Sequence, residues 1–217
     1  MKDNEVPGAL KLIRKAVKAW QTPAVTIIAR ERDPYKVLIS CILSLRTQDK
    51  TTAAASGRLF GLAGTPRGMA GLNAETVEKA IYPVGFYRNK ARAVIGISRM
   101  LVDEYGGKVP DDIGELLKLP GVGRKTANLV VSVGYGKPGI CVDTHVHRIT
   151  NRWGYVRTKT PGETEAALRA RLPRRYWIEI NDLLVTFGQN CCRPVSPICS
   201  ACLVYRYCDR VGVTVSR

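Results

Sequence analysis

The stretch LPGVGRKTANLV, residues 119–130, places a proline and two glycines around one valine and then continues into an apolar helical pattern. Gly121 and Gly123 allow a sharp turn and a close approach of backbone N–H groups to a ligand. Those N–H groups would lie at the start of a helix, where unpaired donors and the helix dipole attract an anion. Together with the helical pattern IGELLKL upstream, the segment predicts a helix, a short hairpin and a second helix.

Helical periodicity dominates the rest of the chain. Leu10, Ile13 and Val17 recur at spacings of three and four and give one apolar face. Residues 35–45 are apolar nearly all round and predict a buried helix, and residues 89–105 predict a long amphipathic one. Because strand alternation is scarce, the sequence predicts an all-α fold.

Cap residues indicate where several of these helices begin. Asn73 and Asp112 each precede a helical pattern, and Thr160 with Glu163 has the form of a capping box. Residues 175–188 predict one further helix near the C-terminus.

Length and charge restrict the class of protein. A chain of 217 residues predicts one domain or two small domains that share a cleft. It has no apolar run near the ~20 residues that cross a bilayer and no secretory signal at its start, so we expect a soluble cytoplasmic protein. Thirty-four Lys and Arg against eighteen Asp and Glu give a net charge of +16, spread along the chain. This excess favours a nucleic acid partner over a merely soluble basic protein.

The seven cysteines fall into two groups. Cys41 and Cys141 lie in apolar surroundings and predict core positions. The other five crowd into residues 191–208, which favours a metal site over disulfides. Four of them follow the spacing C-x6-C-x2-C-x5-C, and Cys191 lies outside it. By spacing alone, zinc and a [4Fe–4S] cluster both remain open.

Several segments resemble one known family in the order in which they occur. They are VLISCILSLRTQD (37–49), YPVGFYRNKA (82–91), LPGVGRKTAN (119–128), VDTHVHRITNR (142–152) and the cysteines between 192 and 208. These segments resemble the endonuclease III family within the helix-hairpin-helix DNA glycosylases. The resemblance implies a two-domain helix-hairpin-helix DNA glycosylase fold, with a six-helix domain at residues 27–137 and a cluster domain made of residues 1–26 and 138–217.

The resemblance also implies a function. We expect a monomeric, nucleoid-associated DNA glycosylase and AP lyase that acts on double-stranded DNA with oxidised pyrimidines or abasic sites in base excision repair. Two alternatives stay open. One is a mismatch-specific (adenine or thymine) or pyrimidine-dimer glycosylase of the same superfamily. The other is a non-catalytic protein that uses the hairpin only to hold phosphates.

The resemblance assigns two catalytic residues. Lys125 would attack C1′ of the damaged nucleoside and form a Schiff base with the opened sugar. A lysine attacks only as the neutral amine, and neighbouring Arg124 and the helix N-terminus both disfavour the ammonium. Asp143, which by its pattern alone is an N-cap, would face the lysine across a cleft and stabilise positive charge on the sugar.

The remaining implied roles concern DNA and the metal. Arg46, where the family commonly has glutamine, and Phe86 would fill the gap that an everted nucleotide leaves. Gln48 and His145 would lie near the DNA. The hairpin residues that would hold a phosphate are Gly121, Val122, Gly123 and Arg124. The residues that would hold a C-terminal [4Fe–4S] cluster are Cys192, Cys199, Cys202 and Cys208.

Overall fold

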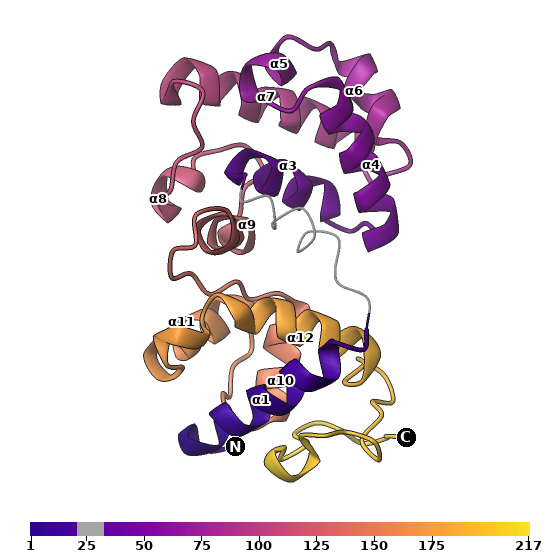
Figure 1. The fold of residues 1–217 in the computed structure, drawn as a ribbon, viewed down its shortest axis with the longest axis vertical. Coiled ribbons are helices and arrows are strands. Elements are labelled where there is room, and N and C mark those ends of the chain that lie inside the picture. Colours follow the sequence, from indigo (N-terminus) through magenta and orange to yellow (C-terminus); the bar gives the residue numbers. More distant parts are fainter. Residues whose placement is uncertain (21–32) are drawn as a thin grey trace. The chain divides into compact units, whose positions relative to one another are not determined.

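The structure is a computed structural model that describes residues 1–20 and 33–217. Every regular element in these residues is a helix or a helical turn, which confirms the predicted all-α fold. The described residues form two compact units (Figure 1). We call residues 33–139 the central unit, and residues 1–20 with 140–217 the terminal unit. The predicted boundary between residues 26 and 27 lies outside the described residues.

The central unit is built around the buried helix α3. Its elements are α3 (Pro34–Ser44), α4 (Asp49–Leu62), α5 (Pro66–Ala70), α6 (Ala74–Ile81), α7 (Tyr87–Tyr105), α8 (Ile113–Leu116), α9 (Arg124–Leu129) and the π-helical turn η2 (Val130–Gly134). Asp33 caps α3 by accepting hydrogen bonds from Tyr35 N at 2.9 Å and Lys36 N at 3.1 Å. Apart from Lys36, residues 35–43 are buried, and α3 packs against α4, α7, α9 and η2. Burial of each large aliphatic side chain contributes about 1.5–3 kcal/mol, so packing on α3 holds the short helices in place.

The terminal unit joins the start of the chain to its end. Its elements are η1 (Asp3–Glu5), α1 (Val6–Val17), α10 (Thr144–Arg152), α11 (Pro161–Arg171), η3 (Arg174–Tyr176), α12 (Glu179–Asn190) and η4 (Tyr205–Tyr207). Helices α1 and α10 both pack against α12. Leu10, Ile13 and Phe187 are buried in this core, and the Trp20 ring lies 6.4 Å from that of Phe187. The apolar face predicted near the N-terminus is therefore the face that α1 buries.

Local structure follows most of the predicted caps and differs in detail. Asn73 Oδ1 accepts from Thr76 N at 2.8 Å, as expected of an N-cap. Thr160 Oγ1 accepts from Glu163 N at 3.2 Å, but the Glu163 carboxylate bonds the N–H of Lys159, one residue before the cap. The helix predicted over residues 175–188 begins only at α12, because residues 174–176 form the 3-10 turn η3.

No helix among the described residues combines the length and the apolar character that a bilayer crossing requires.

The contact between α10 and α12 depends on Gly188. A Cβ atom at this position would collide with the His145 ring and lie 2.9 Å from Arg148 Nη2. Gly188→Ala should therefore lower the free energy of unfolding by about 1–3 kcal/mol, measured from urea denaturation. Gly162→Ala in α11 is the matched control, because among the described residues no atom outside its chain neighbours and its own helix backbone lies within 4 Å of a Cβ there. It should leave stability unchanged or raise it by about 0.4–1 kcal/mol. Equal stability of Gly188→Ala and wild type would contradict this packing.

Candidate active site

The predicted hairpin connects α8 to α9. Gly121 has φ +75°, a conformation that favours glycine, and Val122 N donates to Leu119 O at 3.1 Å to close the turn. Gly123 is the N-cap of α9 with an ordinary φ of −101°. Val122 is buried and anchors the loop to the core. The turn therefore requires a glycine at 121 only, whereas the missing Cβ at 123 leaves the backbone N–H groups accessible.

Lys125 is the second residue of α9 and is exposed to solvent. The next three residues, Thr126 to Asn128, are buried and hold the helix against the core. Burial raises the pKa of the Cys41 thiol on α3 to about 12, and the positive charge of Lys125 acts against this rise. The lysine charge therefore acts on the thiol of a core residue of α3.

Asp143 is the N-cap of α10, and its cap leaves one oxygen unused. Oδ1 accepts from His145 N and from Val146 N, each at 2.9 Å. Both bonds go to the same oxygen, so the cap does not involve Oδ2. His145 is half-buried and its Nδ1 lies 3.1 Å from Arg148 Nη2, so this side chain is part of the packing between α10 and α12.

Helix α10 connects Asp143 to the cysteine segment through two arginines. Arg148 Nη2 donates to Cys192 O at 2.8 Å. Arg152 Nη1 donates to Arg193 O at 2.6 Å and to Cys192 Sγ at 3.4 Å. These bonds fix the start of the cysteine segment to the same helix that carries the carboxylate.

The predicted metal-ligating cysteines lie around one hollow in the terminal unit. The hollow is lined by Cys192, Cys199, Cys202 and Cys208, together with Cys191, two arginines (Arg152 and Arg210) and mainly apolar side chains. Among the described residues, no group of three or more His, Cys, Asp or Glu side chains forms a ready-made metal site, although the four patterned cysteines share the lining of this hollow. Cys41 and Cys141 are buried, which confirms their predicted core positions.

Arg46 and Phe86 come together at the surface of the central unit. The Arg46 guanidinium carbon lies 5.8 Å from the centroid of the Phe86 ring, and both side chains are exposed. Both residues have a left-handed backbone, with φ 52° and 58°. Non-glycine residues held in this region cost energy and cluster at functional sites. Gln48, the N-cap of α4, is exposed two residues after Arg46.

Three comparisons with known proteins identify the family. The model of the HhH-GPD superfamily base excision DNA repair proteins matches residues 39–174. Endonuclease III of Thermotoga maritima is 51% identical over 180 residues, 83% of this chain and 84% of that protein. Endonuclease III of Escherichia coli is 34% identical over 176 residues, 81% of this chain and 83% of that protein. The chain belongs to the endonuclease III family.

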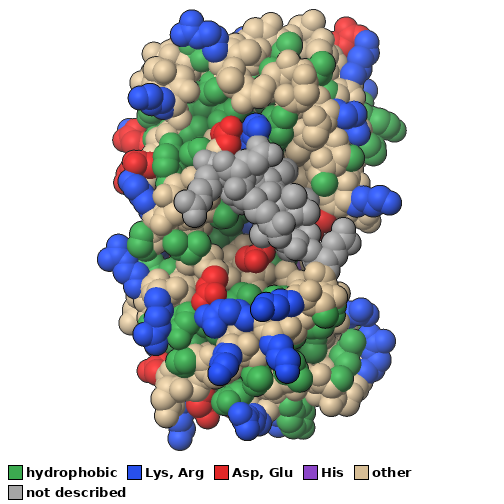
Figure 2. All heavy atoms as spheres, in the orientation of Figure 1, with side chains coloured by type: hydrophobic (Ala, Val, Ile, Leu, Met, Phe, Trp, Pro, Cys, Tyr) green, Lys and Arg blue, Asp and Glu red, His purple; other side chains and the backbone are tan. Residues whose placement is uncertain are grey.

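A solved structure connects this family to DNA chemistry. The structure of a trapped endonuclease III–DNA covalent intermediate is similar to this one, with a TM-score of 0.84 and 34% identity. The match covers 97% of this chain and 97% of the chain in that structure. This member of the endonuclease III family is a DNA glycosylase with AP lyase activity that binds DNA in base excision repair. Lysine and arginine side chains are spread over both units of the face drawn in Figure 2, as expected for a DNA-binding protein.

One residue of this endonuclease III family member lies in the segment YPVGFYRNKA (82–91), but no role was predicted for it from the sequence. Lys90 on α7 is 7% exposed and donates three hydrogen bonds to the segment that carries Arg46. Its signal is helical spacing, because it falls in line with the buried Val94, Ile97 and Leu101. A lysine at a position of the buried apolar face of a helix places a charge in the core. Because buried lysines are rare unless they are paired, this position indicates a specific role.

Proposed function

We propose that the enzyme removes oxidised pyrimidines from duplex DNA, with Lys125 as the nucleophile. The observation that supports this most is the place of Lys125: exposed in the first turn of the second hairpin helix, in a chain similar to the trapped covalent intermediate. The neutral amine would attack C1′, the bond from C1′ to the base would break, and the base would leave with a proton. DNA bound against the exposed side chain would exclude water, which favours the neutral amine.

The lyase step follows from the same adduct. Opening of the sugar gives a Schiff base between Lys125 Nζ and C1′. Loss of a proton from C2′ then expels the 3′ phosphate by β-elimination, which cuts the strand 3′ to the lesion. Water hydrolyses the Schiff base and frees the lysine.

Asp143 would provide the carboxylate for base release. Departure of the base leaves an oxocarbenium-like centre, which a nearby negative charge stabilises. Because the α10 cap engages Oδ1 alone, Oδ2 would serve this task without loss of the cap. The cap fixes the backbone and one oxygen of the carboxylate through two backbone N–H groups.

Hairpin and surface loops would hold the DNA. Backbone N–H groups of residues 121–124 would bind a phosphate of the lesion strand without reading its sequence. Eversion of a nucleotide costs a few kcal/mol, and Arg46 with Phe86 would offset part of this cost by filling the gap.

We also propose that the four patterned cysteines hold a [4Fe–4S] cluster. Their side chains line one hollow, and the Arg152 guanidinium donates to Cys192 Sγ, a bond that stabilises a thiolate. The cluster would crosslink a segment with little apolar area of its own and so fold it against α10. Cys191 would not be a ligand, because it lies outside the spacing C-x6-C-x2-C-x5-C.

Borohydride trapping tests the role of Lys125. Reduction in the presence of an abasic duplex should join wild-type protein covalently to DNA, because hydride converts the Schiff base into a stable amine. Lys125→Ala should lower the yield by at least about 100-fold, measured on a denaturing gel. Lys79→Ala, which removes an exposed lysine paired with Glu75, is the control and should match wild type. Wild-type yield from Lys125→Ala would refute the proposal.

Two substitutions separate the cap from the charge at Asp143. Asn caps a helix as well as Asp does, so Asp143→Asn should keep wild-type stability, whereas Asp143→Ala should lose about 1 kcal/mol. Both should reduce single-turnover base excision by about 100-fold, because both remove the negative charge. Full excision activity in Asp143→Asn would show that the carboxylate serves the helix alone.

Neighbouring cysteines provide a test of the cluster. Anaerobically purified protein should be yellow-brown with about 4 iron atoms and as many acid-labile sulfides. Cys192→Ser should lose most of this iron, while Cys191→Ser should keep it. A colourless wild-type protein that contains zinc would overturn the iron–sulfur assignment.

A further inference from the structure

Two loops of the central unit, which carry Arg46 and Phe86, contact each other. Gly85 N donates to Thr47 Oγ1 at 3.2 Å. A Cβ on Gly85 would lie 2.8 Å from Arg46 O, so only a glycine at position 85 allows the two loops to approach this closely. The positions of the two exposed side chains are therefore coupled through residues 46–47 and 85–86.

Lys90 binds the first of these loops from inside. Its Nζ donates to Leu43 O at 2.8 Å, to Leu45 O at 2.5 Å and to Thr47 Oγ1 at 3.1 Å. An ammonium has three N–H donors, so these acceptors use all of them. Helix α3 ends at Ser44, where the last carbonyls have no partner within the helix. Lys90 satisfies one of these carbonyls, Leu43 O, and binds Leu45 O just after the helix and Thr47 Oγ1 beyond it, so it fixes the residues on both sides of Arg46.

Burial of the Lys90 ammonium costs desolvation free energy, and core packing alone gives no reason to have a lysine at this position. All three acceptors are neutral oxygens, and burial lowers the pKa of Lys90 to about 8. An apolar side chain in line with Val94, Ile97 and Leu101 would fill the same stripe without this desolvation cost. What an apolar residue could not do is bind three oxygens of an irregular loop.

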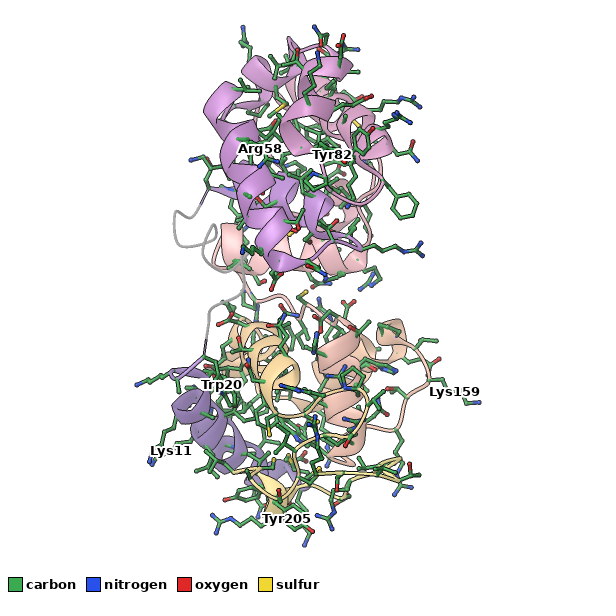
Figure 3. All side chains as sticks on the ribbon, turned by 90° about the vertical axis from the view of Figure 1, so that its right-hand side faces the viewer. Lys11, Trp20, Arg58, Tyr82, Lys159 and Tyr205 are labelled. Atoms are coloured by element: carbon green, nitrogen blue, oxygen red, sulfur yellow. The ribbon has the colours of Figure 1, made fainter. Side chains whose placement is uncertain are left out.

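A second cation, Arg58, binds the end of α6, which leads into the loop that carries Phe86. Arg58 on α4 donates from Nε to Ala80 O at 2.8 Å and from Nη2 to Tyr82 O at 2.5 Å. Arg58 and Tyr82 are labelled in Figure 3. Arg58 therefore fixes the end of α6, and Lys90 fixes the end of α3. The two anchored segments meet where Gly85 donates to Thr47.

We propose that Lys90 is a positioning residue that holds Arg46 and Phe86 in place for insertion into DNA before DNA binds. The inference rests on the proposed function, in which these two side chains fill the gap left by the everted nucleotide. Preformed loops avoid the entropy of ordering them on DNA, so the benefit appears in eversion. Lys90 does not touch the reacting sugar in this account.

The test compares two DNAs that differ in their need for eversion. One is a duplex with a thymine glycol paired to adenine, and the other is a single-stranded oligonucleotide with an abasic site. Lys90→Met should slow single-turnover excision from the duplex by about 10-fold or more, because displaced inserting groups raise the barrier to eversion. Borohydride trapping on the single strand should change by less than about 2-fold, since no base pair has to open. A 2-aminopurine opposite the lesion should show a smaller fluorescence rise on binding.

Two further variants make the comparison specific. Arg92→Met removes an exposed cation from the same helix and should leave both reactions at wild-type rates. Thr47→Val keeps the side-chain shape but removes the oxygen that Lys90 and Gly85 both bind. Thr47→Val should slow duplex excision by about 3-fold. It replaces Lys90→Met in this test if Lys90→Met fails to fold.

The outcomes distinguish this inference from the proposed function. Duplex excision at the wild-type rate by folded Lys90→Met, or equal losses on both DNAs, would overturn the role of Lys90 alone. Unchanged duplex excision by Thr47→Val would do the same if Lys90→Met does not fold. A wild-type protein that is inactive on both DNAs would overturn the proposed function and this inference with it.

Discussion

The position of Lys125 depends on packing, because α9 has only six residues. Isolated helices shorter than about 12–15 residues are marginal in water, so contacts with α3 and η2 hold α9 in place. Two close approaches lie next to this helix. A Cβ at Gly134 in η2, which follows α9, would lie 3.0 Å from Pro34 in α3, and a Cβ at Gly139 would lie 3.0 Å from Asn128 O in α9. The hairpin then needs to supply only a turn, and the core supplies the rigidity that a nucleophile requires.

The Asp143 carboxylate is positioned by hydrogen bonds at a helix N-terminus. Asp143 accepts two backbone N–H groups at the start of α10, and Arg148 and Arg152 bind the cysteine segment further along the same helix. A cluster that folds this segment would therefore also support the helix that carries Asp143. The proposed metal site thus has a structural role that does not require electron transfer.

Sequence patterns predict the parts of this structure that depend on neighbouring residues in the chain. The caps at Asn73 and Asp143 and the buried helix α3 follow from side-chain type and spacing. The π-helical turn η2 does not follow from the sequence, because the same apolar run is compatible with backbone hydrogen bonds that span four residues or five. Lys90 illustrates the other limit: its spacing shows that it is buried, but its three acceptors lie more than 40 residues away in the chain.

The central claim is that one lysine amine joins the sugar, and its most direct measurement is to locate the bond. After borohydride reduction on abasic DNA and nuclease digestion, trypsin should cleave after Arg124 but not at a modified lysine. The sugar remnant should then be found by mass spectrometry in a peptide that begins at residue 125, with fragment ions that place the added mass on Lys125. The same mass on any other lysine, or on the amino group of Met1, would contradict the account.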